Sequence, residues 1–179
     1  MQRANPMAEL ILVASNAVDH WVQRITAMFL VILVGLVLLQ VVARYIFNSP
    51  PIWTEELSRY AMIWAGLLGA TISFKQKFDP SLIQGKTTGR LLKLAKKIVS
   101  SLAVLIYLIP ILWYCVYGPK TNLQRGFLYR HMNTSADVMS FPTIFVAIAV
   151  PIAVLVILLH LAARWAEPIE PKIIDRSQL

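Results

Sequence analysis

Four long stretches without a charged residue constrain this chain more than any other feature of its sequence. They cover residues 25–43, 60–74, 98–119 and 138–163. A helix needs about 20 mostly apolar residues to cross the hydrocarbon core of a bilayer, and three of the four stretches reach that length unaided. Only 15% of the residues are charged, whereas soluble domains carry about 25%. We therefore predict an all-α integral membrane protein with four transmembrane helices and no soluble domain.

The predicted boundaries follow these stretches and the charges beside them, within one membrane domain that covers residues 1–179. The expected segments are an amphipathic surface helix at 7–21, transmembrane helices at 22–46, 52–74, 98–118 and 138–163, a cytoplasmic basic loop with an amphipathic helix at 79–97, and a cytoplasmic tail at 164–179. The surface helix is expected because Met7, Leu10, Ala14 and Trp21 recur at helical spacing. The alternative is that residues 7–21 simply extend the first transmembrane helix. The short connection 47–51 predicts that the first two spans are antiparallel neighbours.

The net charge of +8 could suggest a nucleic-acid partner, but its distribution favours a membrane. Most basic residues fall in the two ends and the middle loop, which lie on one side if there are four spans. The positive-inside rule then places both termini and the middle loop in the cytoplasm. The basic residues that we expect to contact anionic lipid headgroups are Arg90, Lys93, Lys96 and Lys97.

The second uncharged stretch begins beside an unusual group of charges. From Tyr60 it covers only about 22 Å at 1.5 Å per residue, and a bilayer core is about 30 Å thick. A span here must therefore include Glu55, Glu56 and Arg59, at a depth where charges are costly. Glu55 and Arg59 are four residues apart and can pair on one helix face. The group is either a self-neutralised helix end behind two prolines or a docking point for another subunit.

Small residues follow these charges along the same predicted helix. They recur every four residues in two rows, Ala61–Ala65–Gly69 and Gly66–Ala70. Such rows let helices approach one another closely. Trp64 lies about a turn inside Tyr60, so we expect it to pack within protein rather than in an interfacial belt.

The chemistry that a carrier or an enzyme needs is missing from the sequence. No Asp, Glu, Lys, Arg or His lies in the middle of a predicted span, where an ion-coupled carrier needs such a group or broken helices. There is no phosphate-binding glycine loop and no nucleophile elbow. Cys115 is the only cysteine, which excludes an internal disulfide and a thiolate metal cluster. We expect no enzymatic activity, no metal and no cofactor.

The histidines leave one alternative open. His20 and His160 both fall near the predicted cytoplasmic side, and two such side chains from facing helices could bind a b-type haem. This would make the protein a haem- or quinone-associated membrane anchor of a redox complex. An autonomous homo-oligomeric pore is a third possibility, and the lack of a polar helix face speaks against it.

The group Trp53-x-Glu55-Glu56-x-x-Arg59, followed by Trp64 and Gly69-Ala70, resembles the signature of the small membrane subunit of TRAP transporters, the DctQ-like family. Four short spans, a basic loop after the second, and a last span that opens Ser140-Phe141-Pro142 with a later Pro151 extend the resemblance over about residues 15–165. Residues 75–79 depart from it, because relatives often have a turn with His or Gly before an acid there.

The resemblance implies that the chain works with partners in a bacterial inner membrane. In that family a large multi-span transport subunit moves the substrate with sodium ions, and a periplasmic substrate-binding protein delivers an organic anion. The small subunit braces the large one as an accessory scaffold. By analogy the partner interface would include Trp53, Glu55, Glu56, Arg59, Trp64, Gly66, Gly69 and Ala70. On this basis we expect Glu56→Ala or Arg59→Ala to impair uptake or assembly without unfolding the subunit.

Overall fold

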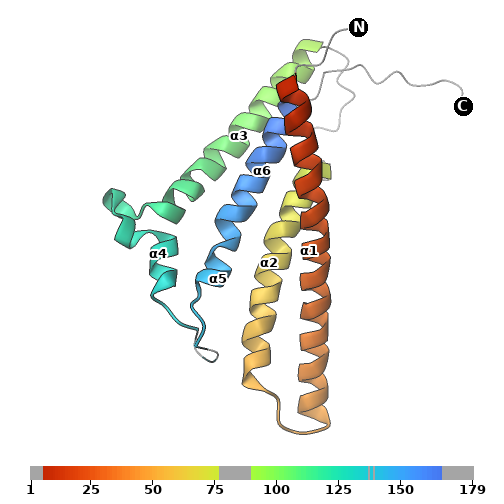
Figure 1. Ribbon diagram of the computed structural model, residues 1–179, viewed down its shortest axis with the longest axis vertical. Helices are drawn as coiled ribbons and strands as arrows, with labels where there is room; N and C mark the ends of the chain where they lie inside the picture. Colours follow the sequence, from red (N-terminus) through yellow and green to blue (C-terminus); the bar gives the residue numbers. More distant parts are fainter. Residues whose placement is uncertain (1–5, 77–89, 137, 139, 167–179) are drawn as a thin grey trace, which may run out of the picture.

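The computed structural model describes residues 6–76, 90–136, 138 and 140–166, and these residues form helices joined by short connections (Figure 1). The helices are α1 (Pro6–Tyr45), α2 (Ile52–Gln76), α3 (Arg90–Val116), η1 (Pro119–Thr121), η2 (Leu123–Arg125), α4 (Phe127–Met132), α5 (Ile144–Ala147) and α6 (Ala149–Ala166). Within these residues the β structure is limited to one isolated bridge between Ser135 and Pro142. The prediction of an all-α protein is confirmed.

Within the described part of the chain, three segments are long and apolar enough to cross a membrane. They are Pro6–Tyr45, Leu94–Val116 and Ile144–Ala166. Helix α2 has 25 residues, which is sufficient length, but Glu55, Glu56, Arg59 and Lys75 lower its apolar character. The protein is therefore a helical membrane protein with three clear candidate spans, and the role of α2 as a fourth span stays a prediction.

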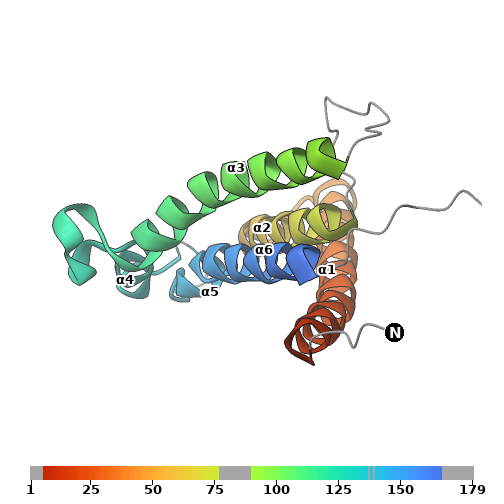
Figure 2. The same ribbon diagram turned by 90° about the horizontal axis from the view of Figure 1, so that it is seen from above.

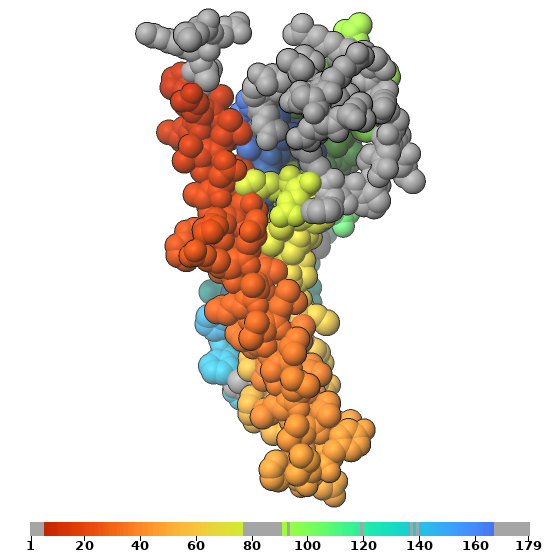
Figure 3. All heavy atoms as spheres, turned by 90° about the vertical axis from the view of Figure 1, so that its right-hand side faces the viewer, coloured from red at the N-terminus to blue at the C-terminus, as the bar shows by residue number. Residues whose placement is uncertain are grey.

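Helix α1 is a single element of 40 residues, about 60 Å long at 1.5 Å per residue. It has no break near residue 22, so the structure differs from the expected separate surface helix and matches the alternative of an extended first span. The physical reason is that the early turns of α1 have tertiary partners: Ser15 and Val22 are both buried. Figure 3 shows α1 running the full height of one face, with α2 beside it.

Helices α1, α2 and α6 pack against one another, and α3 packs mainly on α6 (Figures 1 and 2). The α1–α2 hairpin confirms the expected antiparallel neighbours. Small residues fill much of the contact surface, with Ala61, Ala65, Ala149, Ala153 and Ala163 all buried. Small side chains let helix backbones approach closely, which is how helices associate in lipid.

Helices α3 and α6 show two further local features. Helix α3 includes both the basic residues 90–97 and the apolar span, so the predicted lead-in and span form one helix. Helices α5 and α6 are separated only at Ile148, three residues before Pro151. Proline has no N–H to donate to the carbonyl four residues earlier, which explains the interruption.

Candidate functional site at the start of helix α2

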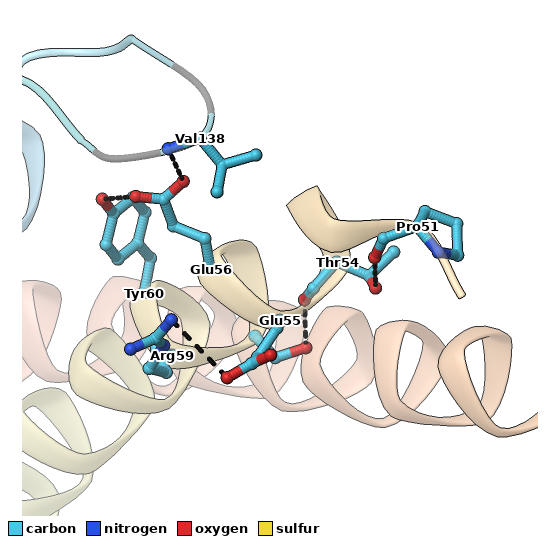
Figure 4. A network of polar contacts seen from close by, with 8 residues as sticks. Pro51, Thr54, Glu55, Glu56, Arg59, Tyr60 and Val138 are labelled. Atoms are coloured by element: carbon cyan, nitrogen blue, oxygen red, sulfur yellow. Dashed lines mark hydrogen bonds and ion pairs between the residues drawn. The ribbon is translucent and has the colours of Figure 1, made fainter. Parts of the chain in front are cut away.

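The start of α2 is held by hydroxyl groups that bond to the backbone. Thr54 is fully buried, and its Oγ1 donates a hydrogen bond of 2.6 Å to the carbonyl oxygen of Pro51. Ser58 Oγ donates to the carbonyl oxygen of Thr54 at 2.7 Å. These contacts fix the first two turns, so the acidic side chains that follow project in defined directions (Figure 4).

Glu56 points into the protein, and only 6% of it is exposed. Its carboxylate accepts a hydrogen bond of 2.8 Å from the hydroxyl of Tyr60 and one of 3.2 Å from the backbone N–H of Val138 (Figure 4). A buried charge is tolerated only when hydrogen bonds compensate its lost hydration. Glu56 therefore ties the start of α2 to the segment that leads into α5.

Glu55 points to the surface, in contrast to its neighbour. It lies 3.6 Å from the guanidinium of Arg59, and both side chains are more than 60% exposed. The predicted i,i+4 pair is confirmed. Exposed pairs of this kind contribute about 0–1 kcal/mol to stability, so the pair has little structural role in the isolated chain. Trp53, two residues before Glu55, is also exposed.

Trp64 joins three helices. Its ring stacks on Phe29 of α1, with centroids 5.5 Å apart and planes 9° from parallel. Its indole N–H donates to the carbonyl oxygen of Phe145 in α5 at 3.2 Å. Trp64 thus packs against other helices of the protein, as the sequence predicted, and these contacts position α2.

The two rows of small residues face different surroundings. Ala61 and Ala65 are buried inside the bundle and Gly69 is half-buried, whereas Gly66 and Ala70 are exposed. A Cβ added at Gly66 would meet no atom within 4 Å. The row that includes Gly66 therefore has open space beside it and does not pack against another of the described helices.

The other end of α2 carries a polar cluster that the sequence reasoning did not identify. Lys75 Nζ lies 3.0 Å from Oδ2 of Asp19 and donates to the carbonyl oxygen of Ser15 at 3.2 Å. Ser15 Oγ and Nδ1 of His160 are 2.9 Å apart in a buried hydrogen bond. The cluster joins α1, α2 and α6. Lys75 ends an uncharged stretch, but nothing in the sequence indicates that its partner is 56 residues away.

The histidines do not support a haem site. His160 is buried against Ser15, whereas His20 is exposed on α1. The two side chains therefore have different surroundings, and the redox-anchor alternative gains no support from the structure.

The predicted lipid-facing cations are only partly within the described residues. Lys96 is exposed, and Lys97 Nζ lies 4.8 Å from the ring centroid of Trp165. The indole N–H of Trp165 donates to Ser101 Oγ at 2.9 Å, which holds the start of α3 against the end of α6. The side chains of Arg90 and Lys93, and the loop residues 79–89, lie outside the described part of the chain.

These observations define a helical membrane protein whose polar side chains mainly fasten its own helices together. The chain belongs to the family of the DctQ component of tripartite ATP-independent periplasmic transporters, whose sequence model matches residues 33–170. It is therefore a component of a transporter family and not a member of an enzyme family.

Two curated relatives agree with this membership. A stretch of 41 residues, 23% of this chain and 26% of the relative, is 54% identical to a putative TRAP transporter small permease protein of Haemophilus influenzae (strain ATCC 51907 / DSM 11121 / KW20 / Rd). A stretch of 62 residues, 35% of this chain, is 26% identical to the sialic acid TRAP transporter permease protein SiaT of Haemophilus influenzae (strain 86-028NP). The chain spans about a quarter of the first relative and 10% of the second. No solved structure matches the chain significantly.

Proposed function

We propose that this protein is the small accessory subunit of a sodium-coupled TRAP importer, where it braces the large transport subunit. The supporting observation is the contrast between the two adjacent acids. Glu56 is used internally, whereas Glu55 and Arg59 are exposed at the end of a membrane-length helix. Charges at such a depth are costly in lipid, and a protein partner would compensate them.

The proposed contact surface is one stripe of α2, which we call the α2 stripe. It contains Glu55, Arg59, Met62, Gly66 and Ala70. Steps of three and four residues place side chains on one helix face, and all five residues are exposed or nearly so. The open space beside Gly66 would let a helix of the large subunit approach closely.

Other sequence-predicted interface residues have a different proposed role. Glu56 and Trp64 hold α2 in place through Val138 and Phe145, so they would act on assembly indirectly. Trp53 is exposed beside the charged pair and would border the contact surface.

The proposed substrate is an organic anion that a periplasmic binding protein delivers. One relative is named a sialic acid permease, and sialic acid is an organic anion. In that relative the matched 62 residues make up only 10% of the chain, so a segment similar to this protein occurs within a much longer permease. This supports a function in which the small subunit lies against a large one.

The proposed location is the inner membrane of a bacterium. The proposed topology has four spans, with α2 as the second and both termini in the cytoplasm. The basic residues of the middle loop support this orientation. Single cysteines introduced at Gln124 and Lys172, in a Cys115→Ser background, would test it. Only the first should react with an impermeant thiol reagent added to intact spheroplasts.

Purification in mild detergent tests the proposed function. We expect a large multi-span protein to co-purify with the tagged chain, and we expect the chain alone in liposomes to transport nothing. Sodium-dependent accumulation of an organic anion by the chain alone would contradict the proposal. So would purification without a large partner under conditions in which the transport activity of the membrane survives.

A further inference from the structure

A small polar cavity lies beside the Ser15–His160 hydrogen bond, at the end of the bundle where α2 and α6 terminate. Its volume is about 30 Å³, and its polar lining consists of Ser15, Asn16, Lys75, His160 and Arg164. A buried site of 10–15 Å³ already holds a water molecule, so this one accommodates a small polar group. Among the residues that the structure describes, no Asp or Glu lines the cavity.

His160 lines the cavity and is a buried polar residue with one unpartnered atom. Only 3% of the residue is exposed, and its Nδ1 is already bonded to Ser15 Oγ. Its other ring nitrogen, Nε2, is buried and has no hydrogen-bond partner among the residues that the structure describes. Leaving such a nitrogen unpaired costs about 1–3 kcal/mol, so buried polar atoms nearly always have a partner.

The charges around the cavity favour an anion. Lys75 is paired with Asp19, which does not line the cavity, and it also donates to the carbonyl oxygen of Ser15. Its ammonium group has three N–H donors, so one is left for an occupant. Arg164 donates one hydrogen bond of 3.0 Å to the carbonyl oxygen of Phe74 and lies 4.5 Å from the centroid of the Phe74 ring. Neither contact neutralises the guanidinium, which keeps further N–H donors.

The position of the cavity along the helix bundle suggests which kind of anion it would bind. Lys75 and Arg164 are the first charged residues after the uncharged stretches 60–74 and 138–163. Trp21 and Trp165, which are 62% and 46% exposed, belong to α1 and α6 near the same end. Exposed tryptophans mark the headgroup level of a membrane, where phosphate groups are abundant.

We propose that this cavity binds a phosphate-type anion, with Arg164 and Lys75 as the charged ligands and His160 as the buried polar contact. Phospholipid headgroups and free phosphate share this chemistry. The proposal depends on the membrane location of the protein and not on its partners in transport. An occupant would link α1, α2 and α6 at the point where their polar cluster lies.

Lipid binding to the purified full chain tests the proposal by native mass spectrometry. The probes are phosphatidylglycerol and a diglucosyl diacylglycerol with the same acyl chains, which lacks phosphate. We expect saturable binding of the phospholipid only, weakened about tenfold or more in Arg164→Gln, because removal of a charge-assisted hydrogen bond has an effect of that size. Arg164→Lys should retain binding. Arg125→Gln is the matched control, because Arg125 is an exposed arginine of η2 that does not line the cavity.

A second arm identifies the source of the phosphate group. Competition by inorganic phosphate would support a site that takes free phosphate, and its failure would support a lipid headgroup site. His160→Phe keeps an aromatic ring, removes both nitrogens and should weaken binding in either case. Thermal unfolding confirms which variants are folded. Equal binding of phosphatidylglycerol by folded Arg164→Gln and Arg125→Gln, or equal binding of the two lipids, would overturn the proposal and leave the cavity to water.

Discussion

The backbone N–H of Val138 donates a hydrogen bond of 3.2 Å to Oε2 of Glu56, across 82 residues of chain. Because of this bond, the two adjacent acids at the start of α2 have different roles. Glu56 is buried and hydrogen-bonded within the protein, whereas Glu55 and Arg59 are exposed. The expectation that Glu56→Ala leaves the fold intact therefore no longer fits the burial of this residue.

Glu56→Ala should destabilise the isolated subunit by about 1–3 kcal/mol, because the Tyr60 hydroxyl and the Val138 N–H lose their partner. Glu56→Gln should cost less, since the amide oxygen still accepts one of these bonds. Thermal unfolding in detergent measures both variants. Identical unfolding of Glu56→Ala and the natural protein would show that the hydrogen bonds do not stabilise the fold.

Arg59→Ala should leave the stability of the isolated subunit within about 1 kcal/mol of the natural value, because its ion pair with Glu55 is exposed. The same change should reduce co-purification of the large subunit. Exchanging the two charges, Glu55→Arg with Arg59→Glu, should keep the subunit folded and still impair assembly. Normal co-purification of the exchanged variant would exclude the pair from the contact surface.

Gly66→Leu should fit the isolated subunit, because an added Cβ meets no atom within 4 Å. In the complex the larger side chain would clash with a partner helix. Overpacking of this kind costs about 1–3 kcal/mol, which would lower the affinity for the large subunit by roughly tenfold or more. Gly35→Leu is the matched control, because Gly35 lies on α1 and also has open space beside it. Equal co-purification with both variants would contradict the proposed α2 stripe.

Asp19→Asn or Lys75→Gln alone should destabilise the subunit by about 1–3 kcal/mol, because each leaves one charge of a largely buried pair without its partner. The double variant should lose less than the sum of the two single losses. A double-mutant cycle of thermal unfolding measures the coupling. Strict additivity would show that the ion pair makes no contribution to the packing of α1 on α2.

The sequence alone determined the class of the protein and much of its local structure. Uncharged stretches indicate membrane helices because charges are costly in lipid, and this reasoning holds without tertiary contacts. The i,i+4 pair of Glu55 and Arg59 was predictable for a similar reason, since it depends only on helix geometry. The family resemblance depended on the same local group of residues and was confirmed.

The tertiary structure decided which side chains of each helix point into the protein and which are exposed. Glu55 and Glu56 are chemically alike and adjacent, but Glu56 is buried where the distant segment around Val138 packs on α2, whereas Glu55 is exposed. The same holds for the cluster of Ser15, Lys75 and His160, whose members come from three helices. Helical periodicity states which residues share a face, but the direction of that face depends on the packing of distant segments, which no local pattern encodes.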